Sequence, residues 1–151
     1  MEDRQDIIQA LTAAYWKELE TVQNYLANSV NLDGVRAEEI KKALGADITE
    51  ELTHAQQLAR RIKVLGGRVP GSMAFEPQQS SLQPPADTTD VMAVIKGVIE
   101  AEEDAIQGYN ELAKLCDGRD YVTQDLAITL LADEEEHRQQ FQSFLREYAR
   151  P

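Results

Sequence analysis

Apolar residues recur along this chain with the 3.6-residue period of an α-helix, in four long segments. A segment with this period buries one face and leaves the other in water. The pattern predicts helices over about 3–30, 35–65, 90–116 and 121–148. Turn-forming residues separate them at 31–34, at the capping glycine pair 66–67, and at 117–120, where Asp120 can cap the last helix. The chain is therefore predicted to be all-α.

The stretch 67–89 has a different character, since it holds four of the five prolines together with Gly, Ser and Gln. As a linker between two domains, it would leave each helix pair with an uncovered apolar face. We therefore predict a crossover inside one domain, 1–151. Some 22 residues reach at most ~70 Å, enough to span a 28-residue helix of ~40 Å, so the second and third helices should run parallel. Thr88 or Thr89 can cap the third helix, and Trp16 marks either a subunit contact or packing under the crossover.

Six polar side chains interrupt the apolar stripes of these helices. They are Glu18, Glu51, His54, Glu102, Glu134 and His137. The two histidines are the only ones in the chain, and each follows a glutamate by three residues, which places both side chains on one helix face. Neighbouring acidic residues such as Glu20, Glu103 and Glu135 fall on polar faces and are expected to be solvated.

Burying four carboxylates together is very unfavourable unless positive charge compensates them. Two divalent cations would match four carboxylates and leave both histidines uncharged. Adjacent oxygen and nitrogen donors suit iron, manganese or zinc. The sequence therefore predicts a buried site for two metal ions, and it predicts that the metal-free protein protonates some of the carboxylates or admits water.

Composition agrees with a metal-binding globular protein. Of 151 residues, 42% are hydrophobic and 28% charged, with a net charge of -12. That charge argues against a nucleic-acid partner and suits attraction of cations. The chain lacks an apolar run of ~18 residues and a secretory leader pattern, so no membrane association is expected. The single cysteine, Cys116, cannot form an internal disulfide, so we expect a cytoplasmic protein.

The arrangement of one glutamate on each of two helices and Glu-x-x-His on each of the other two resembles the ferritin-like di-iron carboxylate family. The runs 18–26 and 130–137 resemble the first-helix and last-helix motifs of bacterioferritin. The likeness covers the whole chain and also extends to mini-ferritin-like proteins. It implies a ferritin-like four-helix bundle with a long crossover, holding two iron ions, with manganese or zinc as alternatives.

The same resemblance implies a role for each residue. The terminal ligands are Glu18 and Glu102, the bridging ligands Glu51 and Glu134, and the capping ligands His54 and His137. Tyr25 and Tyr109 would lie beside the site as hydrogen-bond donors or transient electron donors, or would simply fill the core. The implied activity is that of a ferroxidase, which oxidises Fe(II) with O2 or H2O2 and stores or detoxifies iron in an oligomeric shell.

Two departures from bacterioferritin qualify this picture. Leu52 stands where that family carries its haem-ligating methionine, which argues against haem. The chain also ends soon after its fourth helix, without the short fifth helix of twenty-four-subunit cages, so a homo-oligomer of twelve, twenty-four or fewer subunits fits. The alternatives are a di-metal redox enzyme of this fold, rubrerythrin-like or a manganese catalase, and a non-enzymatic shell or bundle. One cysteine excludes a rubredoxin module within this chain.

Overall fold

The computed structural model describes residues 2–151, with side chains from Arg4 onward. The described chain forms four α-helices and no strand, which confirms the all-α prediction. The helices are α1 (Glu2–Asn31), α2 (Glu38–Val64), α3 (Val91–Leu115) and α4 (Tyr121–Tyr148). Short 3-10 turns form at Val35–Ala37 and Ser72–Ala74. The second helix, predicted from about residue 35, opens with the 3-10 turn Val35–Ala37, and its α-helical part begins at Glu38.

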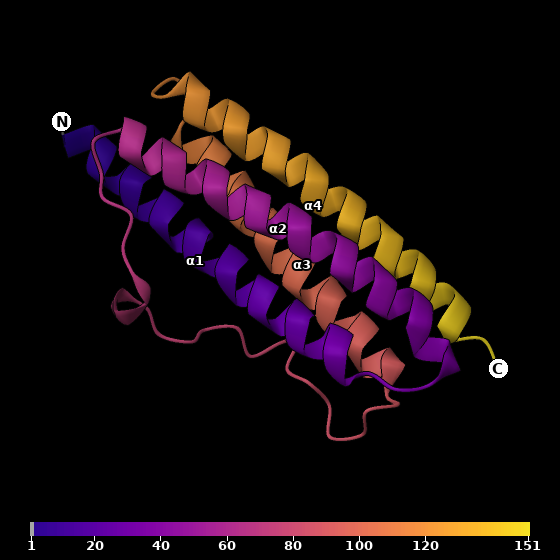
Figure 1. Cartoon of the computed structure of the whole chain (residues 1–151). Coiled ribbons are helices and arrows are strands. Elements are labelled where there is room, and N and C mark those ends of the chain that lie inside the picture. The colour runs from indigo at the N-terminus through magenta and orange to yellow at the C-terminus, as the bar shows by residue number, and fades with distance from the viewer. Residues whose placement is uncertain (1) are drawn as a thin grey trace.

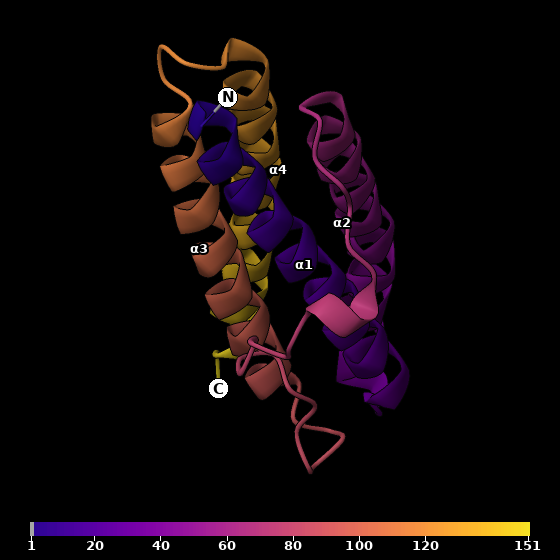
Figure 2. The ribbon, with the colours of Figure 1, turned by 90° about the vertical axis from the view of Figure 1, so that its left-hand side faces the viewer.

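The four helices form an elongated bundle of two antiparallel pairs, α1 with α2 and α3 with α4 (Figure 1). The two pairs meet through α1 against α3 and α2 against α4. The crossover runs back along the outside of α1, so that α2 and α3 point in the same direction, as its length predicts (Figures 1 and 2). Among the described helices, none is long and apolar enough to span a bilayer.

Local capping sets three of the helix ends. Gly66 follows the C-cap of α2 with a φ of 89°, a conformation that suits glycine. Asp120 caps α4 by accepting from the Thr123 N–H at 3.0 Å, as predicted. The cap of α3 is Asp90, which accepts from the Ala93 N–H at 3.1 Å. The predicted Thr88 or Thr89 cap is wrong, since both hydroxyls donate to aspartates of neighbouring turns.

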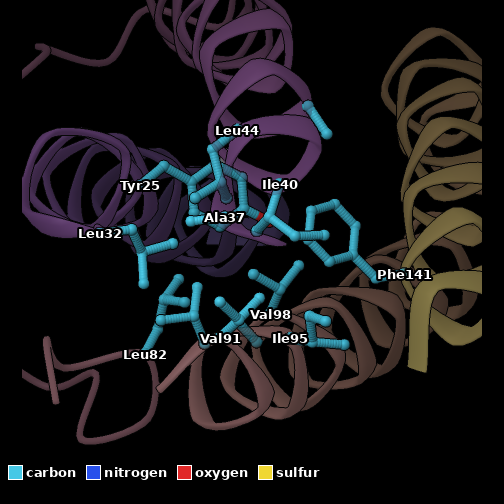
Figure 3. Packing of buried hydrophobic residues seen from close by; sticks show 13 residues of the cluster. Tyr25, Leu32, Ala37, Ile40, Leu44, Leu82, Val91, Ile95, Val98 and Phe141 are labelled. Atoms are coloured by element: carbon cyan, nitrogen blue, oxygen red, sulfur yellow. The ribbon is translucent and has the colours of Figure 1, made fainter. Parts of the chain in front are cut away.

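Buried apolar residues form two clusters, one towards each end of the bundle. The first packs Tyr25, Leu44, Ile95 and Phe141 from all four helices (Figure 3). The second packs Leu11, Leu58, Leu112 and Leu130 around the other end. The six polar residues of the apolar stripes lie between these clusters along the helices. The two clusters therefore hold four helices in register around a polar middle layer.

The crossover is attached to α1 by side chains spaced four residues apart. The Trp16 indole donates to the Glu76 carbonyl at 2.9 Å and stacks on Phe75, with ring centroids 4.4 Å apart. The Glu20 carboxylate accepts the backbone N–H groups of Gln78 and Gln79, both at 3.0 Å. Trp16 therefore packs under the crossover, and the prediction of a solvated Glu20 is wrong, because the crossover covers that face and buries it.

Leu82 is the next point of attachment. Its carbonyl accepts from the Asn28 amide at 2.9 Å. Its backbone also lies against Gly97 of α3, where an added Cβ would be 3.1 Å from the Leu82 Cα. The crossover thus packs on both α1 and α3, although it has almost no regular secondary structure.

Replacing Glu20 by alanine is expected to lower the free energy of unfolding by about 2 kcal/mol, because two backbone donors lose a charged acceptor. Chemical denaturation would measure the loss, and limited proteolysis would detect a loosened crossover. Gln23→Ala on the exposed face of α1 is the matched control. An unchanged stability and cleavage pattern for the Glu20 variant would contradict this role.

Candidate metal centre

The six residues singled out from the sequence meet in the middle layer of the bundle. One glutamate comes from α1 and one from α3, while α2 and α4 each supply a glutamate and a histidine one helical turn apart. None is more than 5% exposed. The set is Glu18, Glu51, His54, Glu102, Glu134 and His137. The helical period turns each of them inward, as it does the apolar residues on either side.

Ligand atoms of these residues form two overlapping groups, within each of which all atoms lie within 4.8 Å of one another. One group is Glu18, Glu51, His54 and Glu134, and the other is Glu51, Glu102, Glu134 and His137. Both groups contain the same two glutamates, one from α2 and one from α4. This arrangement can hold two cations side by side, with two carboxylates shared between them.

Both imidazoles turn Nδ1 towards the centre. The His54 Nδ1 lies 3.0 Å from a Glu134 oxygen and 3.6 Å from a Glu18 oxygen. The His137 Nδ1 lies 3.1 Å from a Glu51 oxygen and 3.8 Å from a Glu102 oxygen. Each nitrogen therefore faces carboxylates from other helices, in the same way in both halves of the site.

Buried atoms without a hydrogen-bond partner gather at this point. Among the described residues, every one of the six contributes at least one such atom, including Nδ1 of both histidines and both oxygens of Glu134. A buried polar atom left unpaired typically costs about 1–3 kcal/mol. The unpaired atoms are oxygens and imidazole nitrogens, the donors that iron, manganese and zinc accept. The residues present therefore fit a pair of divalent metal ions.

Comparison with known proteins agrees with this geometry. The sequence pattern of the ferritin-like domain matches residues 8–150. The chain belongs to the ferritin-like family. A bacterial ferritin of Neisseria meningitidis is 32% identical over 105 residues, covering 68% of this chain and 62% of its own. A DNA protection during starvation protein of Pyrococcus furiosus is 28% identical over 146 residues, covering 95% of this chain and 78% of its own.

Solved structures show the same fold. The bacterioferritin-related protein of Bacteroides fragilis, described as a dodecameric thioferritin, superposes with a TM-score of 0.84 at 29% identity. The match covers 96% of this chain and 87% of that one. A Dps1 variant of Mycobacterium smegmatis superposes with a TM-score of 0.83 at 15% identity, and covers 95% and 97% of the two chains. These likenesses confirm the ferritin-like four-helix bundle.

In this ferritin-like site the surroundings favour protonated histidines when no cation is bound. Burial alone lowers the pKa of His54, but the nearby Glu134 and Glu18 carboxylates outweigh it and raise the pKa to about 11. Burial likewise lowers the pKa of His137, and the nearby Glu134 and Asp47 carboxylates raise it to about 9. Both imidazoles therefore carry a proton at neutral pH that a cation would displace.

The carboxylates divide into two kinds. Burial, followed by neighbouring carboxylates, raises the pKa of Glu51 and of Glu102 well above the usual range. Burial acts in the same direction on Glu134, but the adjacent Glu102 carboxyl and both imidazoles outweigh it and lower its pKa instead. Without a cation, the surroundings thus favour protonated Glu51 and Glu102, the first of the two alternatives predicted from the sequence.

Two tyrosines connect α1 and α3 across the centre. The fully buried Tyr25 on α1 donates its hydroxyl to Glu102 on α3, and Tyr109 on α3 donates to Glu18 on α1. Burial raises the pKa of both phenols, followed by the charge of the adjacent carboxylates, so each keeps its proton. Each tyrosine therefore fixes the orientation of a carboxylate, while also packing in one of the apolar clusters.

Helical periodicity did not reveal the acidic partners of the outer imidazole nitrogens. The His54 Nε2 lies 3.0 Å from an Asp133 oxygen, and the His137 Nε2 contacts Glu50 and lies 3.6 Å from Asp47. The Asp133 side chain is 42% exposed, so it faces both His54 and solvent. A sequence signal existed, since each Glu-x-x-His pair is directly preceded by an acidic residue. Each of those residues contacts the histidine of the opposite helix.

Replacing Asp133 by alanine is expected to weaken metal binding by about 10–100-fold, because the acceptor that orients His54 is removed. Anaerobic titration with Co(II), followed by its visible absorption, would measure the loss. Glu136→Ala, three residues along on the exposed face of α4, serves as the matched control. Equal affinities for the two variants would rule out this role for Asp133.

Proposed function

We propose that this chain is a ferroxidase that binds two Fe(II) ions as substrates and oxidises them together with O2 or H2O2. The observation that carries the proposal is the sharing of Glu51 and Glu134 between two buried groups of donors. Shared carboxylates hold two ions close enough to react with one oxidant molecule. A site for a single metal ion would not need carboxylates shared between two groups of donors.

Each residue has a role in this proposal. The terminal ligands are Glu18 and Glu102, the bridging ligands Glu51 and Glu134, and the capping ligands His54 and His137 through Nδ1. The phenols of Tyr25 and Tyr109 hold the two terminal carboxylates, and either phenol is also placed to donate an electron. Manganese or zinc would fit the same donors. Haem has no part in it, since the half-exposed Leu52 offers no ligand to iron.

The reaction moves two electrons. Two Fe(II) lose one electron each; O2 takes both with two protons to give H2O2, or H2O2 takes both with two protons to give two waters. The chain contributes by holding both ions at once and by keeping four carboxylates away from bulk water. Charge also supports the proposal, since four carboxylates neutralise two Fe(II) when both histidines are unprotonated.

Storage or detoxification of the product in a homo-oligomeric shell completes the proposal. The names of its relatives support an iron-storage or protective role, and the Bacteroides fragilis protein is described as dodecameric. A shell of twelve, twenty-four or fewer subunits is consistent with them. A relative is named for DNA protection, but a net charge of -12 gives this chain little attraction for nucleic acid.

The deciding experiment is an anaerobic Fe(II) titration followed by addition of O2 or, separately, H2O2, with the particle mass measured in solution. We expect saturation at two ions per chain, then fast oxidation, and then uptake of many further ions into a soluble particle. Two ions without further uptake would favour a di-metal redox enzyme of the same fold. Binding without oxidation by either oxidant would overturn the ferroxidase proposal.

A further inference from the structure

A groove between α1 and α3 leads from the surface to the metal centre. It encloses a cavity of about 370 Å³. Five of its eleven lining residues have the smallest side chains, which are Ala10, Ala13 and Ala14 on α1 and Ala105 and Gly108 on α3. The cavity also reaches Glu18 and Tyr109, which belong to the centre. It therefore connects solvent with one edge of the site.

The glycine at position 108 is not required for close packing of α3 against a neighbouring helix. A Cβ added there would find no atom within 4 Å. Glycine inside a helix is less stable than alanine by roughly 0.5–1 kcal/mol, and no neighbouring side chain here requires its small size. The space that a larger residue would fill is the groove itself.

The inner end of the groove is a buried carboxylate with a free acceptor. Glu18 is 3% exposed, and its Oε2 has no hydrogen-bond partner. Its other oxygen accepts the hydroxyl of Tyr109, which lines the same cavity. A small molecule that follows the groove would thus arrive beside one of the six residues of the site.

The apolar lining of the groove, more than its charges, favours an uncharged molecule over a cation. Lys17 lines it, 43% exposed, with its Nζ 3.6 Å from Asp104 of α3. The exposed Glu111 also lines it, and apart from Glu18 and Tyr109 the other lining residues are alanine, glycine and leucine. The side of α2 and α4, in contrast, places Asp47, Glu50 and Asp133 against the outer nitrogens of the two histidines. Cations are attracted to that acidic side.

We propose that the α1–α3 groove is the access route of the small uncharged oxidant, O2 or H2O2, and not of the metal ion. This inference rests on the ferroxidase function proposed above. The oxidant takes two electrons from two Fe(II) ions together with two protons, so it must reach a centre that already holds both ions. A route separate from that of the cation lets it arrive without displacing them.

Filling the groove tests the route. Gly108→Phe from α3 and Ala14→Leu from α1 narrow it independently. Gly108→Ala, which leaves it open, is the first control. Gly45→Phe is the second, because Gly45 of α2 is exposed and a Cβ added there would also meet no atom within 4 Å. Proteins are loaded with two Fe(II) per chain without oxygen and mixed with O2 or H2O2 in a stopped-flow instrument, after a mass check of the assembly.

Both filling variants are expected to lower the second-order rate constant for oxidation at least tenfold, with anaerobic binding of two ions unchanged. The controls should stay within twofold of the wild type. A loss with only one of the two oxidants identifies the one that uses the groove. Wild-type rates in both filling variants would overturn the inference, and so would slower Fe(II) binding with unchanged oxidation, which would make the groove the cation route.

Xenon offers a readout that needs no metal, because it occupies apolar cavities. Crystals of the metal-free wild type and of Gly108→Ala under xenon pressure should show an atom beside Tyr109, and crystals of Gly108→Phe should not. Absence of xenon from the wild-type groove would show that the groove is not apolar enough to admit O2, and would contradict the proposed route. A wild type that binds xenon but does not oxidise Fe(II) would overturn the proposed function while leaving the cavity established.

Discussion

Glu51→Gln is expected to lower the rate of Fe(II) oxidation at least 100-fold and to abolish tight binding of the second ion. Glu51 belongs to both groups of donors, so its loss affects both metal positions at once. Glutamine keeps the size of the side chain but removes the negative charge. Stopped-flow oxidation and anaerobic titration of the same samples would separate lost binding from lost chemistry. His137→Ala should have the same effect on oxidation, since it removes a capping donor.

The metal-free Glu51→Gln protein should nevertheless remain as stable as the wild type. Burial already favours the protonated, uncharged form of Glu51, so an uncharged amide of similar shape replaces it with little loss. Glu135→Gln removes one negative charge from the exposed face of α4, next to a ligand, and is the matched control. Oxidation at the wild-type rate in Glu51→Gln would refute the assignment of the site.

Loading the metal-free protein with two divalent ions at pH 7 is expected to release about four protons per chain, because bound ligands must be unprotonated. They come from four groups whose pKa is raised in the folded protein, which are His54, His137, Glu51 and Glu102. Calorimetric titration with Zn(II) in buffers of different ionisation enthalpy would count them. Release of one proton or none would show that the metal-free site does not hold its charge balance with protons.

The same protons set the pH dependence of stability. Both imidazoles have a pKa raised above the unfolded value of 6.5, so their contribution is complete below pH 6.5 and is lost as the pH rises through about 9 for His137 and about 11 for His54. The free energy of unfolding of the metal-free protein should therefore fall between pH 6.5 and 9, by up to about 1.4 kcal/mol per pH unit for each imidazole.

Saturating Zn(II) should largely abolish this fall over the same range, because the ligands of the loaded form are unprotonated, as the same side chains of the unfolded chain become above pH 6.5. Chemical denaturation of the two forms between pH 6.5 and 9 would compare their slopes. The Glu135→Gln variant should behave like the wild type in both. Parallel slopes for the metal-free and metal-loaded forms would contradict the protonation of this centre.

The sequence by itself was sufficient to identify the four helices, the parallel course of α2 and α3, and the six inward polar residues. The reason is that helical period is a local property: a glutamate such as Glu102, placed where an apolar residue is expected, shares the buried face of its own helix. The spacing of Glu134 and His137 puts both on one face without reference to any other element. Those local relations need no knowledge of how the helices meet.

Only the tertiary structure decided which groups meet across helices. The pairing of His54 with Asp133, and of His137 with Glu50, depends on the axial register of α2 against α4, which the packing of the two apolar clusters determines. Glu20 is buried because the crossover, over fifty residues further along the chain, lies on that face of α1. Periodicity gives the direction of a side chain within its helix, but its partner is set by long-range packing.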